Sequence, residues 1–248
     1  MSSCIVLLLA ATVAAAEPMR LRYEASWAGL PAGEVYVLLD EPGDSYRMAI
    51  DIQSRGLPKL LTRFRASGQS TGRVAADAPR PQAYDVDYDL RRRAKRVRLR
   101  YDANLVRRVA GDTATHPELP EQHRRDTLDP LAVLSEIRRR VIRGLEPGET
   151  FQLATYDGKR RLDAEVVRDP KADPGTIRLK LMLRPVAGFR NAGDDEGDPE
   201  DSPRPAEIVL SADGRAIPLR LSVNVALLPL TVTWAGDCRQ TVCAVTLP

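Results

Sequence analysis

Apolar and polar residues alternate along most of this chain. The alternating segments span residues 21–27, 47–53, 84–90, 96–101, 177–184 and 219–225. A period of two is typical of strands that bury one face and expose the other, as antiparallel strands do. Asp157-Gly158 and Asp213-Gly214 supply turn signals between such segments. The pattern therefore predicts a mainly β fold of roughly ten strands, arranged as a curved antiparallel sheet or a partly open β-barrel.

One segment has helical spacing instead. Its apolar residues recur every three to four positions, at Leu131, Leu134, Ile137, Val141 and Leu145. Asp129 and Pro130 precede them as an N-cap residue and a first-turn proline, and the helix is expected to end at Gly144 or at 147–148. We predict a single amphipathic helix packed on the concave face of the sheet.

The N-terminus has the pattern of an export signal. An apolar run at 5–11 leads into three alanines at 14–16 and then into the polar Glu17-Pro18. Because no Lys or Arg precedes the run, an apolar N-terminus that is not exported is the alternative. We expect residues 1–16 to be a cleavable signal peptide and residues 17–248 to form one β-rich domain in the periplasm. No later stretch is apolar for long enough to cross a membrane, so we expect that domain to be soluble.

The charge balance and the cysteines narrow the class of protein further. The chain has 37 Lys and Arg against 34 Asp and Glu, and this balance argues against a nucleic-acid binder. Cys4 would leave with the signal peptide. Cys238 and Cys243 remain and are expected to form a disulfide in an oxidising compartment. A redox or metal-binding pair is the less favoured alternative, because the spacing is not Cys-x-x-Cys and no His is near.

A run of seven cations in residues 91–100 is the most prominent candidate for an anion site. The preceding segment carries Asp85, Asp87 and Asp89 on one face. A hairpin with a loop at 91–94 would place these acids opposite Arg100, Arg98 and Arg96 respectively, so most of the cations would be paired. The remaining candidates are Arg91, Arg92, Arg93 and Lys95, for which a solvated loop is the alternative.

Other candidate sites are weaker. Leu57, Leu60 and Leu61 form either a rim loop that contacts an apolar partner or a buried loop. Residues 194–201 form an acidic stretch, which we interpret as part of a flexible insertion that spans residues 190–205. A calcium site is the less favoured alternative, because the stretch lacks the spacing of an EF-hand. We find no metal-ligand cluster, G-x-S-x-G motif or P-loop, and therefore expect no metal, no cofactor and no enzymatic activity. Hydrolysis by paired carboxylates stays open, because such pairs leave no sequence signature.

Several short motifs resemble a known family. They are residues 23–33, Ser54-Arg55-Gly56-Leu57 with Phe64, the stretch from Asp129-Pro130-Leu131 to Arg138 with Gly148 and Asp157-Gly158, and residues 213–219. Together they resemble the bacterial exported family catalogued as domain of unknown function 3108. The acidic insertion and the Cys238–Cys243 tail depart from its pattern. The resemblance implies an exported, mostly β protein with no assigned reaction and no catalytic residues.

A curved sheet covered by a helix is suited to an apolar ligand. We therefore expect a periplasmic, non-catalytic binding or carrier protein for a lipid or another apolar ligand in envelope biogenesis. The helix would then act as a lid, and Arg91–Arg93 or Arg138–Arg140 would meet a headgroup. The alternative is an envelope scaffold or interaction module that binds a protein or a glycan through its rim loops.

Overall fold

The computed structural model describes residues 17–56, 64–76, 78–90, 93–111, 117–189, 202–225 and 228–238. In these ranges the chain forms one antiparallel sheet of 13 strands, one α-helix and one short 3₁₀ helix. The elements are β1 Met19–Trp27, β2 Leu30–Asp40, β3 Ser45–Ser54, β4 Arg65–Ala75, β5 Ala78–Leu90, β6 Arg93–Asp102, β7 Leu105–Ala110, η1 Glu121–His123, α2 Pro130–Ile142, β8 Thr150–Tyr156, β9 Arg161–Arg168, β10 Thr176–Ala187, β11 Arg204–Ser211, β12 Pro218–Val225 and β13 Leu228–Asp237.

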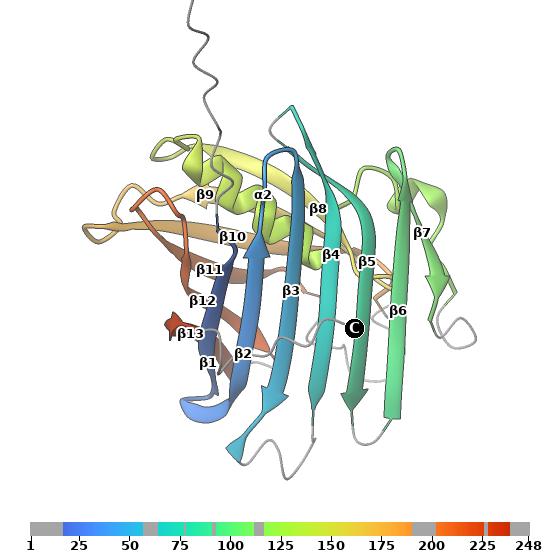
Figure 1. Cartoon of the computed structure of the whole chain (residues 1–248), viewed down its shortest axis with the longest axis horizontal. Coiled ribbons are helices and arrows are strands. Elements are labelled where there is room, and N and C mark those ends of the chain that lie inside the picture. The colour runs from blue at the N-terminus through green and yellow to red at the C-terminus, as the bar shows by residue number, and fades with distance from the viewer. Residues whose placement is uncertain are drawn as a thin grey trace, which may run out of the picture.

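The first and last strands lie side by side in the middle of the sheet. The spatial order is β7-β6-β5-β4-β3-β2-β1-β13-β12-β11-β10-β9-β8, so β7 and β8 are the edges. Figure 1 shows β2–β6 side by side at the front, with β9–β11 crossing behind them and α2 between the two halves. The mainly β, curved and barrel-like fold with one helix confirms the prediction, although the strand count is higher than the predicted ten.

The segment before α2 joins the two edges. Arg125 forms an isolated bridge with Leu105 of β7, and Leu128 forms one with Thr155 of β8. Arg108 of β7 also donates to the Gly158 carbonyl, beyond the end of β8, at 2.8 Å. The edges are thus linked through irregular chain rather than through direct pairing, and the sheet stays open.

β4 explains why alternation undercounts the strands. The positions of this strand that face the interior are small: Gly68, Ser70 and Gly72. A Cβ at Gly72 would lie 2.7 Å from the Tyr46 ring, so a neighbour's large side chain occupies the space above the strand. A strand whose inward residues are small has no apolar period to detect.

The helix begins and ends where the sequence predicts. The Asp129 side chain accepts from the backbone N–H groups of Leu131 and Ala132, which is N-cap geometry. The helix stops at Ile142, and Gly144 follows it at φ +96°, a conformation that glycine adopts without strain.

The helix packs on both halves of the sheet. Ile137 and Val141 pack with residues of β8–β11, whereas Ala132 packs with residues of β1–β3. These contacts hold the helix as an internal plug.

The β5–β6 hairpin has the predicted faces but a different register. Leu90 pairs with Arg93, so the connection is 91–92 rather than 91–94. Asp85 therefore lies opposite Arg98, not Arg100, and Asp89 lies opposite Ala94, not Arg96. Two of the predicted ion pairs survive as diagonal contacts: Arg100–Asp85 at 2.7 Å and Arg98–Asp87 at 2.6 Å. Long guanidinium side chains reach diagonal neighbours, so charge pairing alone does not fix the register.

Candidate functional site

The two ends of the barrel-like sheet differ in their interior, because the helix α2 occupies only one of them. We call the end at which β1 turns into β2 the Trp27 end, at the bottom of Figure 1, and the end at which β2 turns into β3 the Glu41 end. α2 starts next to Ser70, in the middle of β4, and Arg138 on it reaches Glu41. The helix therefore occupies the half of the interior that lies toward the Glu41 end.

An apolar wall lines the inner face at the Trp27 end. Val232 and Val223 pack against the core clusters, which fixes the inward face of β13 and β12. Strand alternation and direct pairing then give the same orientation to their neighbours. The wall consists of Trp27, Leu30, Leu221, Val223, Val225, Leu228 and Leu230, with Val223 opposite Leu230, Leu230 opposite Trp27, and Trp27 opposite Leu30.

Much of this wall is open to solvent. Leu30 is 54% exposed, Leu228 42%, and Leu221 and Val225 just under 40%. Trp27 is half-buried, and its Nε1 donates to the Val225 carbonyl at 3.4 Å, so the indole lies across the end of β12. Contiguous apolar surface of this kind marks a binding surface more often than a scattered exposed leucine does.

The inner face at this end also carries cations. Lys95 pairs with Tyr88 and shares the inward face of β6 with Val97, and it is exposed. Arg204 opens β11 on the same face as Ala206 and Ile208. The acids Asp51, Asp87 and Asp89, in contrast, occupy the outward positions of β3 and β5.

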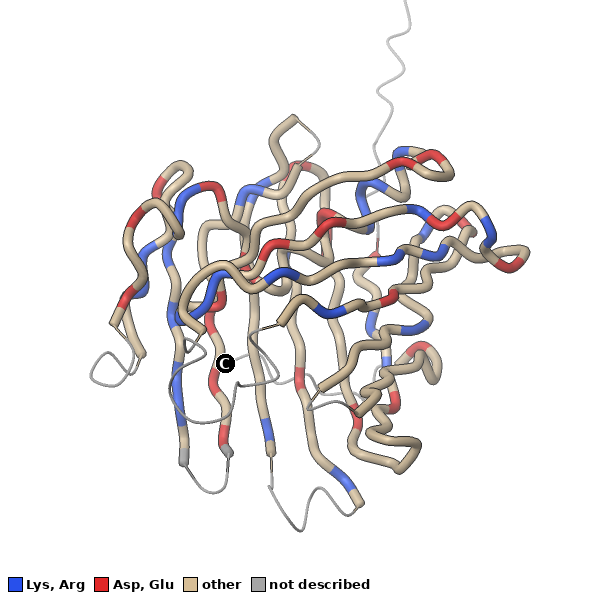
Figure 2. Tube along the Cα trace, turned by 180° about the vertical axis from the view of Figure 1, so that it is seen from behind, with Lys and Arg blue, Asp and Glu red and all other residues tan. Residues whose placement is uncertain are grey.

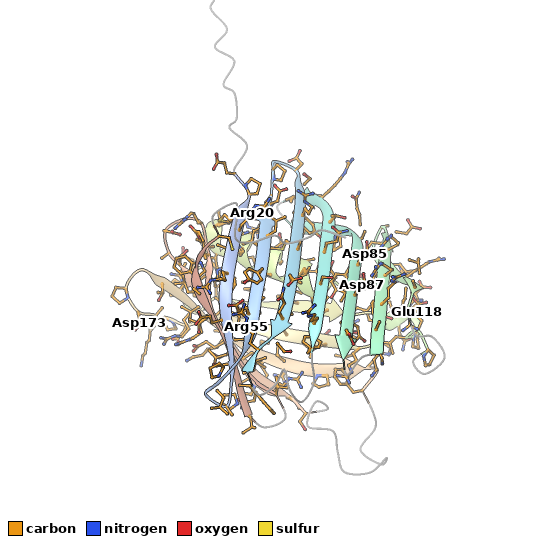
Figure 3. All side chains as sticks on the ribbon, turned by 60° about the horizontal axis from the view of Figure 1, so that its bottom comes forward. Arg20, Arg55, Asp85, Asp87, Glu118 and Asp173 are labelled. Atoms are coloured by element: carbon orange, nitrogen blue, oxygen red, sulfur yellow. The ribbon has the colours of Figure 1, made fainter. Side chains whose placement is uncertain are left out.

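For most of the candidates from the sequence, the structure describes only the flanking strands. Leu57, Leu60, Leu61, Arg91 and Arg92 lie outside the described residues, so their roles stay predictions. The strand ends that flank them, Ser54 with Arg65 and Leu90 with Arg93, are both at the Trp27 end. Figure 3 shows Arg55, which precedes the first of these connections, together with Asp85 and Asp87 on β5.

Arg138 lies at the opposite end and has a structural role. Its side chain is 2% exposed and pairs with Glu41 at 2.5 Å. Its remaining donors reach the Ala216 carbonyl at 3.2 Å and the Arg215 carbonyl at 2.9 Å. These bonds fasten α2 to the β2–β3 and β11–β12 turns, an arrangement that suits a fixed plug and not a lid.

A polar cleft of about 620 Å³ lies over β3–β6 and brings Asp51, Asp87 and Asp89 to one surface. Hydrogen bonds from Arg98 and Arg96 lower the pKa of Asp87, which makes it a poor proton donor. Burial raises the pKa of Asp129 to about 6, but that side chain is fully buried at the helix N-terminus. Neither carboxyl group offers the exposed general acid that carboxylate hydrolysis requires.

A second groove, of about 730 Å³, crosses the outer face of β9–β13. Figure 2 shows acidic and basic residues interspersed along the strands of this back half. Several of them pair across strands, as Arg220 does with Glu207 at 2.9 Å and Arg184 with Glu165 at 3.2 Å. Surface pairs of this kind serve solubility and register more than ligand binding.

Other sequence predictions fall partly or wholly outside the described residues. Cys238 is disulfide-bonded, but Cys243 is outside the described residues, so their pairing stays a prediction. The same holds for residues 1–16 and for the acidic stretch at 194–201. Within the described ranges, no helix has both the length and the apolarity needed to cross a membrane.

Sequence reasoning missed the wall because its strands are far apart in the chain. Trp27 lies opposite Leu230 only because β1 pairs with β13, about two hundred residues away. Each strand alone shows the alternation of an ordinary core strand, and nothing local indicates that its last residues extend beyond the core.

Comparison with known proteins places the fold and the family. No curated protein sequence matches the chain. The crystal structure of a β-barrel-like protein of domain of unknown function DUF1849 from Brucella abortus is similar, with a TM-score of 0.53 and 11% identity over 90% of this chain and 98% of that one. A DUF1089 family protein from Pseudomonas aeruginosa aligns with a TM-score of 0.37 and 9% identity over 87% of this chain and 95% of that one, which is too low to support an argument. The model of the family DUF3108, described as protein of unknown function, matches residues 22–227, and the chain belongs to that family.

Proposed function

We propose that this protein is an exported, non-catalytic binding protein that takes a ligand with an acyl chain at the Trp27 end, in the periplasm. The observation that carries the proposal is the apolar wall, which continues the core along β12, β13 and β1 and then remains exposed. The N-terminal pattern of residues 1–16 supports export.

Energetics favour an apolar occupant. Fully burying a Leu or Val side chain contributes about 1.5–3 kcal/mol. The wall exposes Leu30, Leu221, Val225 and Leu228 together, and a chain laid along them would recover part of that free energy. Among the described residues, the wall consists of aliphatic and indole side chains with no carboxylate beside them on the same face, which is the lining expected for a hydrocarbon ligand.

The charges at the mouth fit a ligand with an anionic head. Lys95 and Arg204 share the inner face with the wall, and the acids of β3 and β5 face outward. A carboxylate or phosphate at the end of the acyl chain would meet a cation at this end, which is the arrangement expected of an anionic lipid.

Native mass spectrometry of protein purified gently from a periplasm tests the proposal. We expect an added mass that is lost on organic extraction and is identified as a lipid. Leu230→Glu should abolish it, because the new charge points into the wall. Thr231→Glu is the matched control, since Thr231 is the next residue of β13 and faces outward opposite Ser26 and Ser222. No added mass in any preparation, or equal loss in both variants, contradicts the proposal.

A second candidate function is an envelope interaction module. The exposed Leu30 and Leu228 lie at the rim, where an apolar partner protein would reach them. A lipid-free mass, together with a defined protein partner whose binding is lost in Leu30→Glu, would favour this function.

A further inference from the structure

We infer that the cleft at the Glu41 end is a second binding site, for a small molecule that combines an anionic group, a carboxylate or a phosphate, with an apolar part. The cleft has a volume of about 580 Å³ and lies between the end of α2, the β2–β3 turn and the β11–β12 turn. That volume is within the range of small-molecule sites. This inference is independent of the proposed function, because the Trp27 end is at the other side of the plug.

The floor of the cleft holds more guanidinium groups than its acid neutralises. Glu41 Oε2 accepts from Arg138 and Glu41 Oε1 accepts from Ser135 at 2.6 Å, so both carboxylate oxygens are already occupied. Arg139 is left with a 3.6 Å contact between its Nε and Glu41 Oε1. That Nε is buried and makes no hydrogen bond with the described residues.

Further cations surround Arg139. Arg143 and Arg215 also line the cleft, and the second acid in its lining is Glu17. Arg215 is paired with Asp213 at 2.7 Å. Among these arginines, Arg139 is the one whose buried Nε has only a 3.6 Å carboxylate contact. A guanidinium that lacks a close acceptor, beside other arginines of the cleft, makes an anion the favoured occupant.

The helix C-terminus does not account for these cations. A helix end carries a partial charge of about −0.5, which one nearby cation offsets. Arg140, in the same turn, pairs with Glu136 and lies over the Phe151 ring, outside the cleft lining. Arg143, the C-cap residue, is sufficient for the helix end, so Arg139 remains beyond what that end needs.

The rest of the lining is apolar or open. Met19, Leu39 and Ile142 contribute apolar side chains. Ile142 is the last residue of the helix and is 49% exposed. A Cβ built at Gly43 or Gly214 would meet no atom within 4 Å, so both turns leave space at the cleft. A ligand with one charged end and a short apolar part therefore matches the lining better than a bare inorganic ion does.

Calorimetric titration with hexyl phosphate, hexanoate, inorganic phosphate and hexanol tests the inference. We expect hexyl phosphate or hexanoate to bind, inorganic phosphate to bind more weakly, and hexanol not to bind. Arg139→Gln should weaken binding of the alkyl anion by about tenfold or more. Arg140→Gln is the matched control and should leave the affinity unchanged. Ile142→Ser should weaken the binding of the alkyl anion but not the binding of inorganic phosphate.

The titration is repeated in the Leu230→Glu background, so that any binding at the apolar wall is excluded from the result. The inference is overturned if no probe binds to protein whose unfolding temperature shows that it is folded. It is also overturned if the Arg139 and Arg140 variants have equal effects on binding. Vesicles with and without phosphatidylglycerol distinguish the source of the anion. Sedimentation that depends on Arg139 indicates a lipid headgroup, whereas alkyl anion binding without sedimentation indicates a free small molecule.

Discussion

Ser70 Oγ donates a 2.8 Å hydrogen bond to Asp129 Oδ2 across 59 residues of sequence. The other oxygen of the same carboxylate accepts from the backbone N–H groups of Leu131 at 3.0 Å and Ala132 at 2.9 Å. The Tyr46 hydroxyl is 3.3 Å from Ser70 Oγ and extends the network to β3. One buried side chain therefore both starts the helix and fastens it to the sheet.

Asp129 should make stability depend on pH. Burial raises its pKa from 3.8 to about 6, against hydrogen bonds that lower it. The native state then holds more protons than the unfolded state between about pH 4 and pH 6, so this group's contribution to the free energy of unfolding falls as the pH rises through that window. A shift of about two units corresponds to roughly 3 kcal/mol. Urea unfolding at several pH values measures the slope.

Asp129→Asn should remove that slope, because asparagine still caps a helix but carries no charge. Asp213→Asn is the control. Hydrogen bonds from Ser211 and Arg215 lower the pKa of Asp213 to about 2. The pH dependence of stability due to Asp213 therefore lies below pH 4 and has the opposite sign. A variant at Asp129 that keeps the wild-type slope between pH 4 and pH 6 would contradict the assignment.

Glu41→Gln should destabilise the fold strongly, because it leaves the Arg138 charge buried without its partner. Removing one member of a buried pair costs about 3–5 kcal/mol. The matched control is Glu165→Gln in the exposed pair with Arg184, which should cost less than about 1 kcal/mol. The double variant Glu41→Gln with Arg138→Met should be more stable than Glu41→Gln alone, and the reverse order would refute the argument.

Gly72→Ala should destabilise more than Gly68→Ala. A Cβ at Gly72 would lie 2.3 Å from the Arg80 carbonyl oxygen, which is backbone and cannot move aside. At Gly68 the nearest atom is Val86 Cγ2 at 2.7 Å, the end of a side chain that can shift. Overpacking costs about 1–3 kcal/mol, and we expect Gly72 at the upper end of that range. Thermal unfolding of both variants compares them, and equal losses would argue against backbone contact as the cause.

Reduction of the Cys238 disulfide should cost about 2 kcal/mol if its partner is Cys243, because the closed loop is short. Cys243→Ser should lower stability by the same amount and should abolish any further effect of reductant. A reductant effect that persists in Cys243→Ser would show that Cys238 has another partner.

The class of fold follows from sequence because its determinants are local. Alternation around Met48 and Ile50, the cap at Asp129 and the turn at Gly214 each depend on neighbouring residues alone. The register of β5 and β6 did not follow, since Arg98 reaches Asp87 as easily from a diagonal position as from the opposite one.

The candidate site was harder to predict, because it depends on pairing between distant strands. Arg138 has the sequence context of an exposed helix residue. It is buried because it pairs with Glu41, which is far away in the sequence. The wall around Trp27 likewise forms when β1 meets β13. The charge of Lys95 makes it a candidate from sequence, but its inward direction depends on the register of β5 and β6.

The position of β1 and β13 at the centre of the sheet also sets an order of folding. Strands β1–β7 and strands β8–β13 each form a meander of neighbouring hairpins, whose contacts are short in sequence. The seam between β1 and β13 is the pairing with the longest loop, and loop closure of that length is slow. We expect each meander to assemble early as an independent unit, and the central seam between β1 and β13 to pair last. Joining the two chain ends and opening the chain between β7 and η1 would turn that late seam into a local hairpin and should speed folding.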